Sequence, residues 1–182
     1  GLGEVNSYAV TVGRMSRFKG TYEAVEHLVG SGLGLVVIGG AKESENTALR
    51  DYGDSLGVTV RVLSGIDSES MRAVMRNSAA IIGLAHGEAF GLTPIEAMAL
   101  GTPPVFVNEG GYTETIVDQF NGRLVERGDV EAWHRALEQA RDPGTRERWA
   151  RNGLARIEEL GLTPQEHAKR LYSIVNSDEL QQ

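Results

Sequence analysis

The chain contains no cysteine among its 182 residues, which excludes disulfide bonds, thiolate metal sites and thiol nucleophiles. No apolar run approaches the roughly 20 residues of a membrane-spanning helix, and no secretory signal pattern is visible. Positive charge is not in excess either, because 25 acidic side chains outnumber 18 basic ones and give a formal net charge of −7. A surface of this charge does not favour nucleic acid as a partner.

Several familiar nucleotide-binding and catalytic motifs are also missing. The sequence has no Gly-x4-Gly-Lys-Ser/Thr phosphate loop, no Asp-x-Asp pair to bridge a metal to a diphosphate, and no Gly-x-Ser-x-Gly nucleophile elbow. The glycine-rich stretch 30–34 precedes an apolar run instead of following one, so it is not a dinucleotide-binding fingerprint. The histidines lack metal-ligand spacing, and His27, His134 and His167 are expected on helix surfaces.

What the sequence does contain is an alternation of short apolar runs and longer helical patterns. The apolar runs are continuous, which is typical of strands covered by helices on both faces. Repeated strand–helix units predict an α/β fold with a doubly wound, Rossmann-like parallel sheet of about six strands. The expected strands are Tyr8–Val12, Leu35–Ile38, Val58–Leu63, Ala80–Leu84, Val105–Val107 and Gly122–Val125.

Helices are expected between these strands and after the last of them. Asp129 is placed to cap a helix that runs to Arg141, and residues 142–144 are predicted to form a turn. Trp133 and Trp149 fall in this helical region and are expected to anchor its packing. The expected helices are Thr21–Val29, Ser44–Leu56, Ser68–Arg76, Pro94–Leu100, Tyr112–Val117, 129–141, Thr145–Leu160 and Pro164–Val175.

The densest chemical pattern lies in segment 86–96, between an expected strand and an expected helix. Gly91 permits close approach of the backbone to a ligand, and the amide groups that follow it would begin a helix, where the helix dipole favours an anion. Two glutamates, Glu88 and Glu96, stand on either side of this turn. The pattern suits a ligand that carries both phosphates and hydroxyls.

The end of this segment also has a purely structural interpretation. Residues 93–96, Thr-Pro-Ile-Glu, form a capping box with Thr93 at the N-cap and Glu96 closing the box. The same form recurs at 163–166, with no chemical pattern around it. The motif alone therefore indicates a helix start, and a ligand would compete with the cap for Glu96.

A second loop, 13–20, follows the first expected strand and carries Arg14 and Lys19. Taken alone it is a solvated basic loop. Because the carboxyl ends of parallel strands share one edge of the sheet, it can face the loop that holds Glu88. Arginine offers phosphate oxygens a planar fork and lysine a point charge, so a diphosphate held here would be neutralised. His86, close to Glu88 in sequence, is a further candidate contact.

Six segments occur in a fixed order along nearly the whole chain. They are Val12-Gly13-Arg14 with Lys19-Gly20, Leu35–Gly39, Glu88–Ala99, Gly101-Thr102-Pro103, Gly110–Glu114 and Asn121–Val125. Together they resemble the C-terminal, donor-binding domain of family 4 retaining glycosyltransferases of the GT-B architecture. Two departures are His86-Gly87, where the family more often has a serine-containing pair, and Pro104, where valine is usual.

The resemblance implies a role for each matching residue. Arg14 and Lys19 would hold the donor diphosphate, and Glu88 would contact hydroxyls of the transferred sugar, which makes these three the catalytic set. Glu96 would accept hydrogen bonds from the ribose hydroxyls, and the base would lie near 62–65. The implied donor-binding residues are Gly13, His86, Phe90, Gly91, Leu92, Thr93 and Glu96.

The implied activity is transfer of a hexose-type sugar from a nucleotide-diphosphate-sugar to a glycan, lipid or small-molecule acceptor. In the mechanism usually inferred for the family, the leaving diphosphate assists attack from the same face, with no metal and no cofactor. The chain opens with Gly1 and reads as one domain of a longer protein. An N-terminal domain would bind the acceptor, and helix 164–175 would cross back to it, so the isolated chain is expected to bind donor weakly and transfer little. The implied location is the cytoplasm, for many relatives at the inner face of the membrane, with peripheral membrane association of the full-length protein.

Two other interpretations stay open. A GT-B relative such as an epimerase or a phosphorylase would use the same donor residues for another reaction. A nucleotide-binding module that only senses or scaffolds would share the fold, although loss of Arg14, Lys19 or Glu88 would then be expected and all three are present. The base, the sugar and the acceptor are not specified by the sequence.

Overall fold

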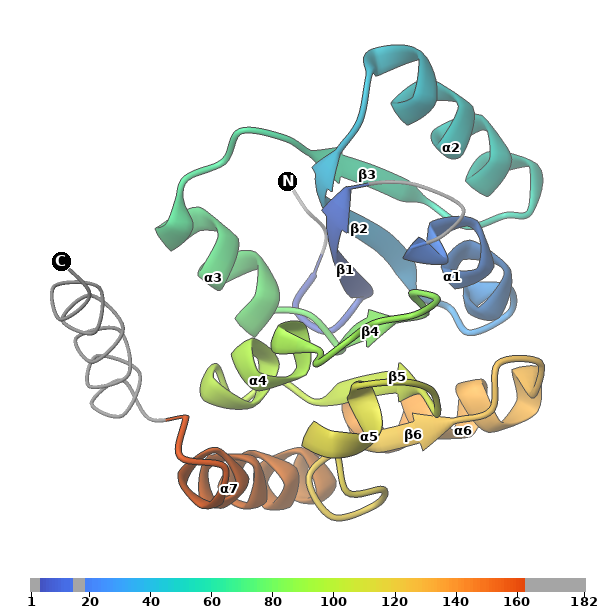
Figure 1. Ribbon diagram of the computed structural model, residues 1–182. Coiled ribbons are helices and arrows are strands. Elements are labelled where there is room, and N and C mark those ends of the chain that lie inside the picture. The colour runs from blue at the N-terminus through green and yellow to red at the C-terminus, as the bar shows by residue number, and fades with distance from the viewer. Residues whose placement is uncertain (1–3, 15–18, 163–182) are drawn as a thin grey trace, which may run out of the picture.

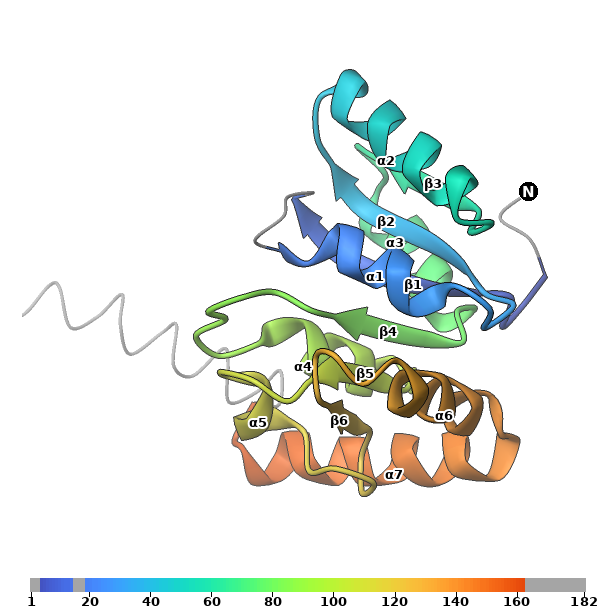
Figure 2. The same ribbon diagram turned by 90° about the vertical axis from the view of Figure 1, so that its right-hand side faces the viewer.

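The computed structural model describes residues 4–14 and 19–162. Its strands are β1 Tyr8–Arg14, β2 Gly34–Gly40, β3 Val60–Leu63, β4 Ala80–Gly83, β5 Pro104–Val107 and β6 Arg123–Val125. All neighbouring pairs are parallel, and the six strands form one sheet in the order β3-β2-β1-β4-β5-β6 (Figure 2). This confirms the predicted Rossmann-like sheet. The winding direction reverses between β1 and β4, and ligands of open α/β sheets bind at such a reversal.

Helices cover both faces of the sheet. The helices are α1 Thr21–Leu28, α2 Glu43–Ser55, α3 Ser68–Arg76, α4 Leu92–Ala99, α5 Tyr112–Thr115, α6 Val130–Arg141 and α7 Pro143–Glu159. Figure 1 shows α1, α2 and α6 on one face and α3 and α4 on the other. Helix α7 packs against both α4 and α6, at the β6 end of the sheet. No helix within residues 4–14 and 19–162 has the length and apolar character needed to cross a membrane.

The core lies along the central strands and beneath the C-terminal helices. Every residue of β4 and β5 is buried, as expected for strands with helices on both sides. Trp133 and Trp149 are also buried, and their indole nitrogens donate to the carbonyl oxygens of Glu126 and Gln119. Both tryptophans therefore anchor packing, as predicted.

Two helix starts differ from the prediction. Helix α4 begins at Leu92 after Gly91, which is left-handed with φ 68° and provides no side-chain cap. The predicted capping box with Thr93 at the N-cap is therefore wrong. The left-handed glycine turns the chain directly into the helix, and Pro94 falls in the first turn, where a missing N–H costs little. Likewise, the predicted turn at 142–144 is the beginning of α7.

Histidine placement also corrects the prediction. His27 is buried between α1 and α6, where its ring stacks on Trp133 with centroids 5.0 Å apart. It was expected on a surface because α1 alone gives no sign that α6 will cover it. His134 is only half-buried. His167, the expected helix 164–175 and the second Thr-Pro motif lie outside the described residues.

Candidate functional site

The start of α1 and the loops that follow β4 and β5 lie at the carboxyl edge of the sheet (Figure 2). There Lys19 Nζ lies 3.4 Å from Glu88 Oε2, in an ion pair between the loop after β1 and the loop after β4. The fold thus brings together two of the three residues predicted to be catalytic. The third, Arg14, ends β1 with its backbone beside Gly40, and its side chain lies outside the described part of the structure.

Two helices begin beside this ion pair without a side-chain cap. Helices α1 and α4 start at Gly20 and Gly91, which are both left-handed with φ values of 67° and 68°. By contrast, aspartates cap α3, α6 and α7 through hydrogen bonds to backbone amides. No N-cap side chain therefore accepts from the first amide groups of α1 and α4, an arrangement that suits an anion.

Glycines in the loop after β5 allow that loop to fit closely against the loop after β4. A Cβ atom on Gly110 would lie 2.6 Å from Glu88 O, and one on Gly111 would overlap Phe90 Cα. The Gly111 amide donates to Glu88 O at 2.8 Å. The backbone of Glu88 is thus held by contacts that no larger residue at positions 110 and 111 would permit.

Tyr112 packs between Phe106 of β5 and Gly91 at the end of the loop after β4. Its ring packs at 59° on Phe106, with centroids 4.7 Å apart, and a Cβ on Gly91 would lie 2.8 Å from its Cδ1. Burial raises the pKa of Tyr112 to about 12. The phenol is therefore neutral at physiological pH and does not add charge beneath Glu88.

Between the loops lies a small hollow of about 50 Å³. It is lined by Thr11, Val12, Lys19, Ile82, Gly83, Ala85, Glu88, Thr93, Phe106 and Tyr112. Of the predicted donor-binding residues, Thr93 lines the hollow. Gly13 lies in β1, Phe90 is half-buried in the loop, and Leu92 is 63% exposed at the start of α4.

Glu96 lies one helical turn beyond Leu92, on the same face of α4. The residue is exposed, yet surrounding protein removes part of the carboxylate's water and raises its pKa. Within residues 4–14 and 19–162, no protein group donates a hydrogen bond to this carboxylate. The predicted competition between a capping box and a ligand for Glu96 therefore does not occur, because the helix is not capped from Glu96.

His86 points to α1. Its Nε2 lies 3.0 Å from Glu23 Oε1, and His86 is not among the residues that line the hollow. Its contact with Glu23 leaves only Nδ1 for another partner.

Arg127, which follows β6, was missed by sequence reasoning. Its Nη1 donates to Glu23 Oε2 at 2.6 Å and to Leu84 O at 2.9 Å. Its Nε and Nη2 donate to the two carboxylate oxygens of Glu109, at 2.9 and 2.6 Å. We call these three charged residues, Glu23, Glu109 and Arg127, the Arg127 clamp.

The clamp stabilises the charged forms of its members. Hydrogen bonds from Arg127 lower the pKa of Glu109. At Glu23, partial burial alone would raise the pKa. Hydrogen bonds with Arg127 and His86 outweigh this burial, so the pKa of Glu23 is lowered. Hydrogen bonds to Glu109 in turn raise the pKa of Arg127, which is 22% exposed. Because 104 positions separate Arg127 from Glu23, no local pattern signals the contact.

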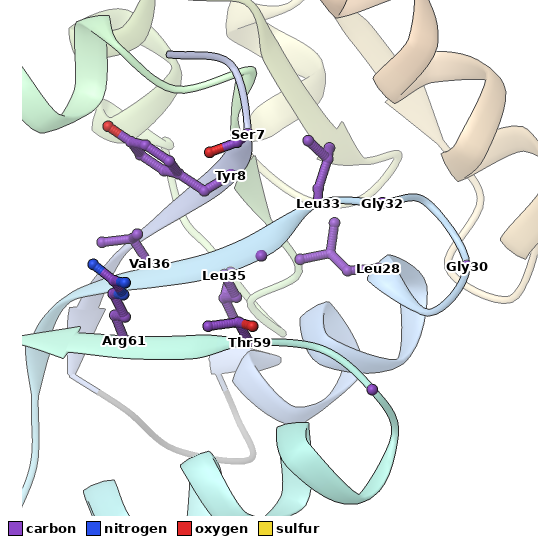
Figure 3. A pocket seen from close by; sticks show the side chains of 12 residues that line it. Ser7, Tyr8, Leu28, Gly30, Gly32, Leu33, Leu35, Val36, Thr59 and Arg61 are labelled. Carbon is purple, nitrogen blue, oxygen red and sulfur yellow. The ribbon is translucent and has the colours of Figure 1, made fainter. Parts of the chain in front are cut away.

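A larger cavity, of about 600 Å³, lies at the opposite, amino edge of the sheet (Figure 3). Its wall includes the glycine-rich stretch 30–34 and the starts of β1, β2 and β3, and Arg61 is its one charged residue. The Ser7 hydroxyl donates to Glu4 O and the Tyr8 hydroxyl to Val74 O. These hydroxyls are already used by the protein, and the described wall has no carboxylate or imidazole.

Among the described residues, no group of three or more histidine, aspartate or glutamate side chains is arranged to hold a metal ion. The charged groups at the carboxyl edge pair with one another instead. Lys19 contacts the carboxylate of Glu88. Arg127 contacts the carboxylates of Glu23 in α1 and Glu109 in the loop after β5.

The fold is a Rossmann-like α/β domain of the kind found in GT-B glycosyltransferases. The model for the family described as glycosyl transferases group 1 matches residues 3–156. The chain belongs to this family.

Individual relatives agree with this assignment. The chain is 32% identical over 146 residues to a D-inositol 3-phosphate glycosyltransferase from Corynebacterium aurimucosum, a match that covers 74% of this chain and 35% of that protein. The chain thus spans about a third of the length of this curated relative.

Solved structures share the fold over most of the chain. A C-terminal domain of a glycosyl transferase group 1 family protein (LpcC) from Francisella tularensis superimposes with a TM-score of 0.70 at 25% identity, covering 86% of this chain and 87% of that one. The Anabaena protein Alr3699/HepE, solved in complex with UDP-glucose, gives a TM-score of 0.73 at 20% identity and covers 92% of this chain and 49% of that chain.

Proposed function

We propose that this chain is the donor-binding half of a retaining glycosyltransferase, which moves a hexose-type sugar from a nucleotide-diphosphate-sugar to an acceptor without a metal. The observation that carries the proposal is the Lys19–Glu88 ion pair between two uncapped helix starts. It combines a cation and free amides, which suit a diphosphate, with a carboxylate, which suits sugar hydroxyls. Family membership supports sugar transfer as the reaction class.

Donor binding would rearrange this ion pair. Lys19, with its side chain 50% exposed, would exchange Glu88 for a phosphate oxygen, and Arg14 would supply a second cation. Glu88 would then accept hydrogen bonds from hydroxyls of the sugar. Glu96, which has no donor among the described residues, would accept from the ribose hydroxyls, and the base would lie near 62–65.

Transfer would proceed on one face of the sugar. The acceptor hydroxyl oxygen forms a bond to the anomeric carbon as the bond from that carbon to the diphosphate oxygen breaks. The hydroxyl proton passes to the departing phosphate oxygen. Configuration is retained because the acceptor attacks from the face that the diphosphate leaves. Lys19, Arg14 and the start of α4 stabilise the negative charge that develops on the diphosphate.

The size of the hollow supports a divided site. Pockets that enclose a small ligand measure about 300 Å³ or more, whereas the hollow beside Glu88 measures about 50 Å³. A donor would lie largely on an open surface, which a second domain with the acceptor site would cover. The curated relative from Corynebacterium aurimucosum, of which the match covers 35%, is more than twice as long as this chain and has room for such a domain.

Calorimetric titration with UDP-glucose, GDP-mannose and ADP-glucose, each with and without EDTA, tests the binding. We expect one of them to bind, and EDTA should not change its affinity. The Arg14→Ala and Lys19→Ala variants should each lose most of this affinity. Arg135→Ala is the matched control, because Arg135 makes only an exposed pair with Glu131 on α6. Absence of binding by all three donors at low salt would contradict the proposal.

A transfer assay on the full-length parent separates an enzyme from a scaffold. Loss of transfer in Glu88→Ala, with donor binding retained in part, supports the assigned role of Glu88. NMR of the product reports the anomeric configuration. An inverted product refutes retention, and an epimerised or phosphorolysed donor identifies one of the alternative GT-B reactions.

A further inference from the structure

We propose that Arg127 is a positioning residue for the loop after β4, residues 84–91, which we call the donor loop. The Arg127 clamp fixes segment 84–88 of this loop, and with it the Glu88 carboxylate, without touching the donor. The inference rests on the proposed function of Glu88. Arg127 is 22% exposed, and its guanidinium already donates to Glu23, Glu109 and the Leu84 carbonyl. In this proposal the clamp therefore acts on the donor through the loops that it joins.

Each partner of Arg127 belongs to a segment that carries or contacts a site residue. Glu23 lies in the first turn of α1, the helix that begins directly after Lys19 and Gly20. Leu84 is the first residue after β4, where the loop to Glu88 begins. Because a Cβ on Gly20 would overlap Leu84 O, the start of α1 and the start of this loop are also in direct contact.

The third partner reaches Glu88 from the other side. Glu109 immediately precedes Gly110, whose neighbour Gly111 donates its amide to Glu88 O at 2.8 Å. Arg127 therefore connects α1 and the start of the donor loop to the loop after β5, which packs on Glu88. Segment 84–88 is held at its two ends, through the carbonyl of Leu84 and the carbonyl of Glu88.

The geometry requires an arginine. Three guanidinium nitrogens bind four oxygens at 2.6 to 2.9 Å, two of them on Glu109. A lysine ammonium keeps the charge but lacks this planar fork. Without any cation, the carboxylates of Glu23 and Glu109 would face each other in a partly buried site and repel, which would separate the loops.

Hydrogen exchange tests the positioning without a donor. In Arg127→Met we expect the Gly111 amide to exchange about tenfold faster or more. The Leu35 amide, which donates to Thr59 O at the amino edge, should not change. Arg135→Met is the matched control, and Arg127→Lys should give an intermediate rate. An unchanged Gly111 rate in Arg127→Met would overturn the inference.

Donor binding tests the consequence for the site. We expect Arg127→Met to weaken binding of the nucleotide-sugar about tenfold and binding of the corresponding bare nucleoside diphosphate by less than about twofold. In a Glu88→Ala background, Arg127→Met should cause no further loss of sugar-dependent affinity. Equal losses for both ligands, or additive losses in the double variant, would mean that Arg127 only stabilises the fold.

Two further outcomes are distinguishable. If Arg127→Met does not fold, Glu109→Gln replaces it, because Arg127 keeps its bonds to Glu23 and Leu84, and the same criteria apply. If the wild-type protein binds none of the three donors, the proposed function fails, and the Gly111 exchange rate alone then decides whether the clamp holds the loop.

Discussion

At the amino edge of the sheet, a cavity of about 600 Å³ has a described wall without a carboxylate or an imidazole. At the carboxyl edge, a hollow of about 50 Å³ holds an ion pair and lies beside two uncapped helix starts. The charged groups gather at the smaller space because parallel strands point the loops that follow them to one edge. We therefore base the proposed donor site on the converging charges and uncapped helix starts rather than on cavity size.

The largest expected effect comes from filling the contact between the two loops at the carboxyl edge. In Gly111→Ala the added Cβ would overlap Phe90 Cα, so the loops must separate. We expect loss of donor binding and a stability loss of about 3 kcal/mol, measured by calorimetry and urea unfolding. The control Gly144→Ala, where the nearest atom would lie at 3.5 Å, should leave both unchanged. Normal donor binding by Gly111→Ala would show that the close fit is not required.

Removal of one positive charge at each edge should change donor affinity at the carboxyl edge and not at the amino edge. Lys19→Ala at the carboxyl edge should weaken donor binding by about 10- to 100-fold, as expected for loss of a charge-assisted contact. Arg61→Ala, in the wall of the amino-edge cavity, should change donor affinity by less than about twofold. Calorimetry at low and high salt checks both, because added salt should weaken binding by the wild type more than by Lys19→Ala. The reverse ranking of the two variants would move the site to the amino edge.

Titration at the carboxyl edge should affect binding. Loss of water raises the pKa of Glu96, so its proton returns at a higher pH than for an ordinary glutamate. Only the ionised carboxylate accepts from both ribose hydroxyls. We expect donor affinity to fall as the pH is lowered towards this raised pKa, and Glu96→Gln to bind weakly with a flatter pH profile. An identical profile in Glu96→Gln would exclude Glu96 as the cause.

Titration of the buried His27 should instead affect stability, with the smallest effect. Burial lowers the pKa of His27, although a hydrogen bond with the Arg127 backbone and the charges of Glu23 and Glu26 partly oppose it. The unfolded chain therefore binds the proton more readily, and the stability contributed by neutral His27 is present above about pH 6.5 and is lost as the pH falls below it. The urea midpoint should decrease between about pH 7.5 and about pH 5.5, and less so in His27→Gln. A pH-independent midpoint in the wild type would contradict this assignment.

The fold could be predicted because its signals are local. Continuous apolar runs such as Ala80–Leu84 indicated buried parallel strands, and the structure has β4 at Ala80–Gly83. The boundaries were less certain where one backbone conformation decides them. The left-handed Gly91 starts α4 before Thr93 and Pro94, although the composition of residues 93–96 favoured a start at Thr93.

The candidate site could be predicted only in part. Lys19 and Glu88 were expected to face each other because both follow strands of one parallel sheet, and the structure brings them to 3.4 Å. The Arg127 clamp could not be predicted, because its residues lie 104 and 18 positions apart and meet only through the strand order. The burial of His27 was missed for the same reason, since α6 covers it from a distant part of the chain.

The close fit between the loop after β4 and the loop after β5 has a consequence for protein engineering. Gly110 and Gly111 contact the backbone of Glu88 and Phe90 rather than their side chains, so the fit depends on the path of both loops. A donor loop transplanted from another family member would keep its shape only together with its own β5–α5 turn. Chimeras that exchange segments 84–91 and 108–112 as a single unit should therefore fold better than chimeras that exchange either segment alone.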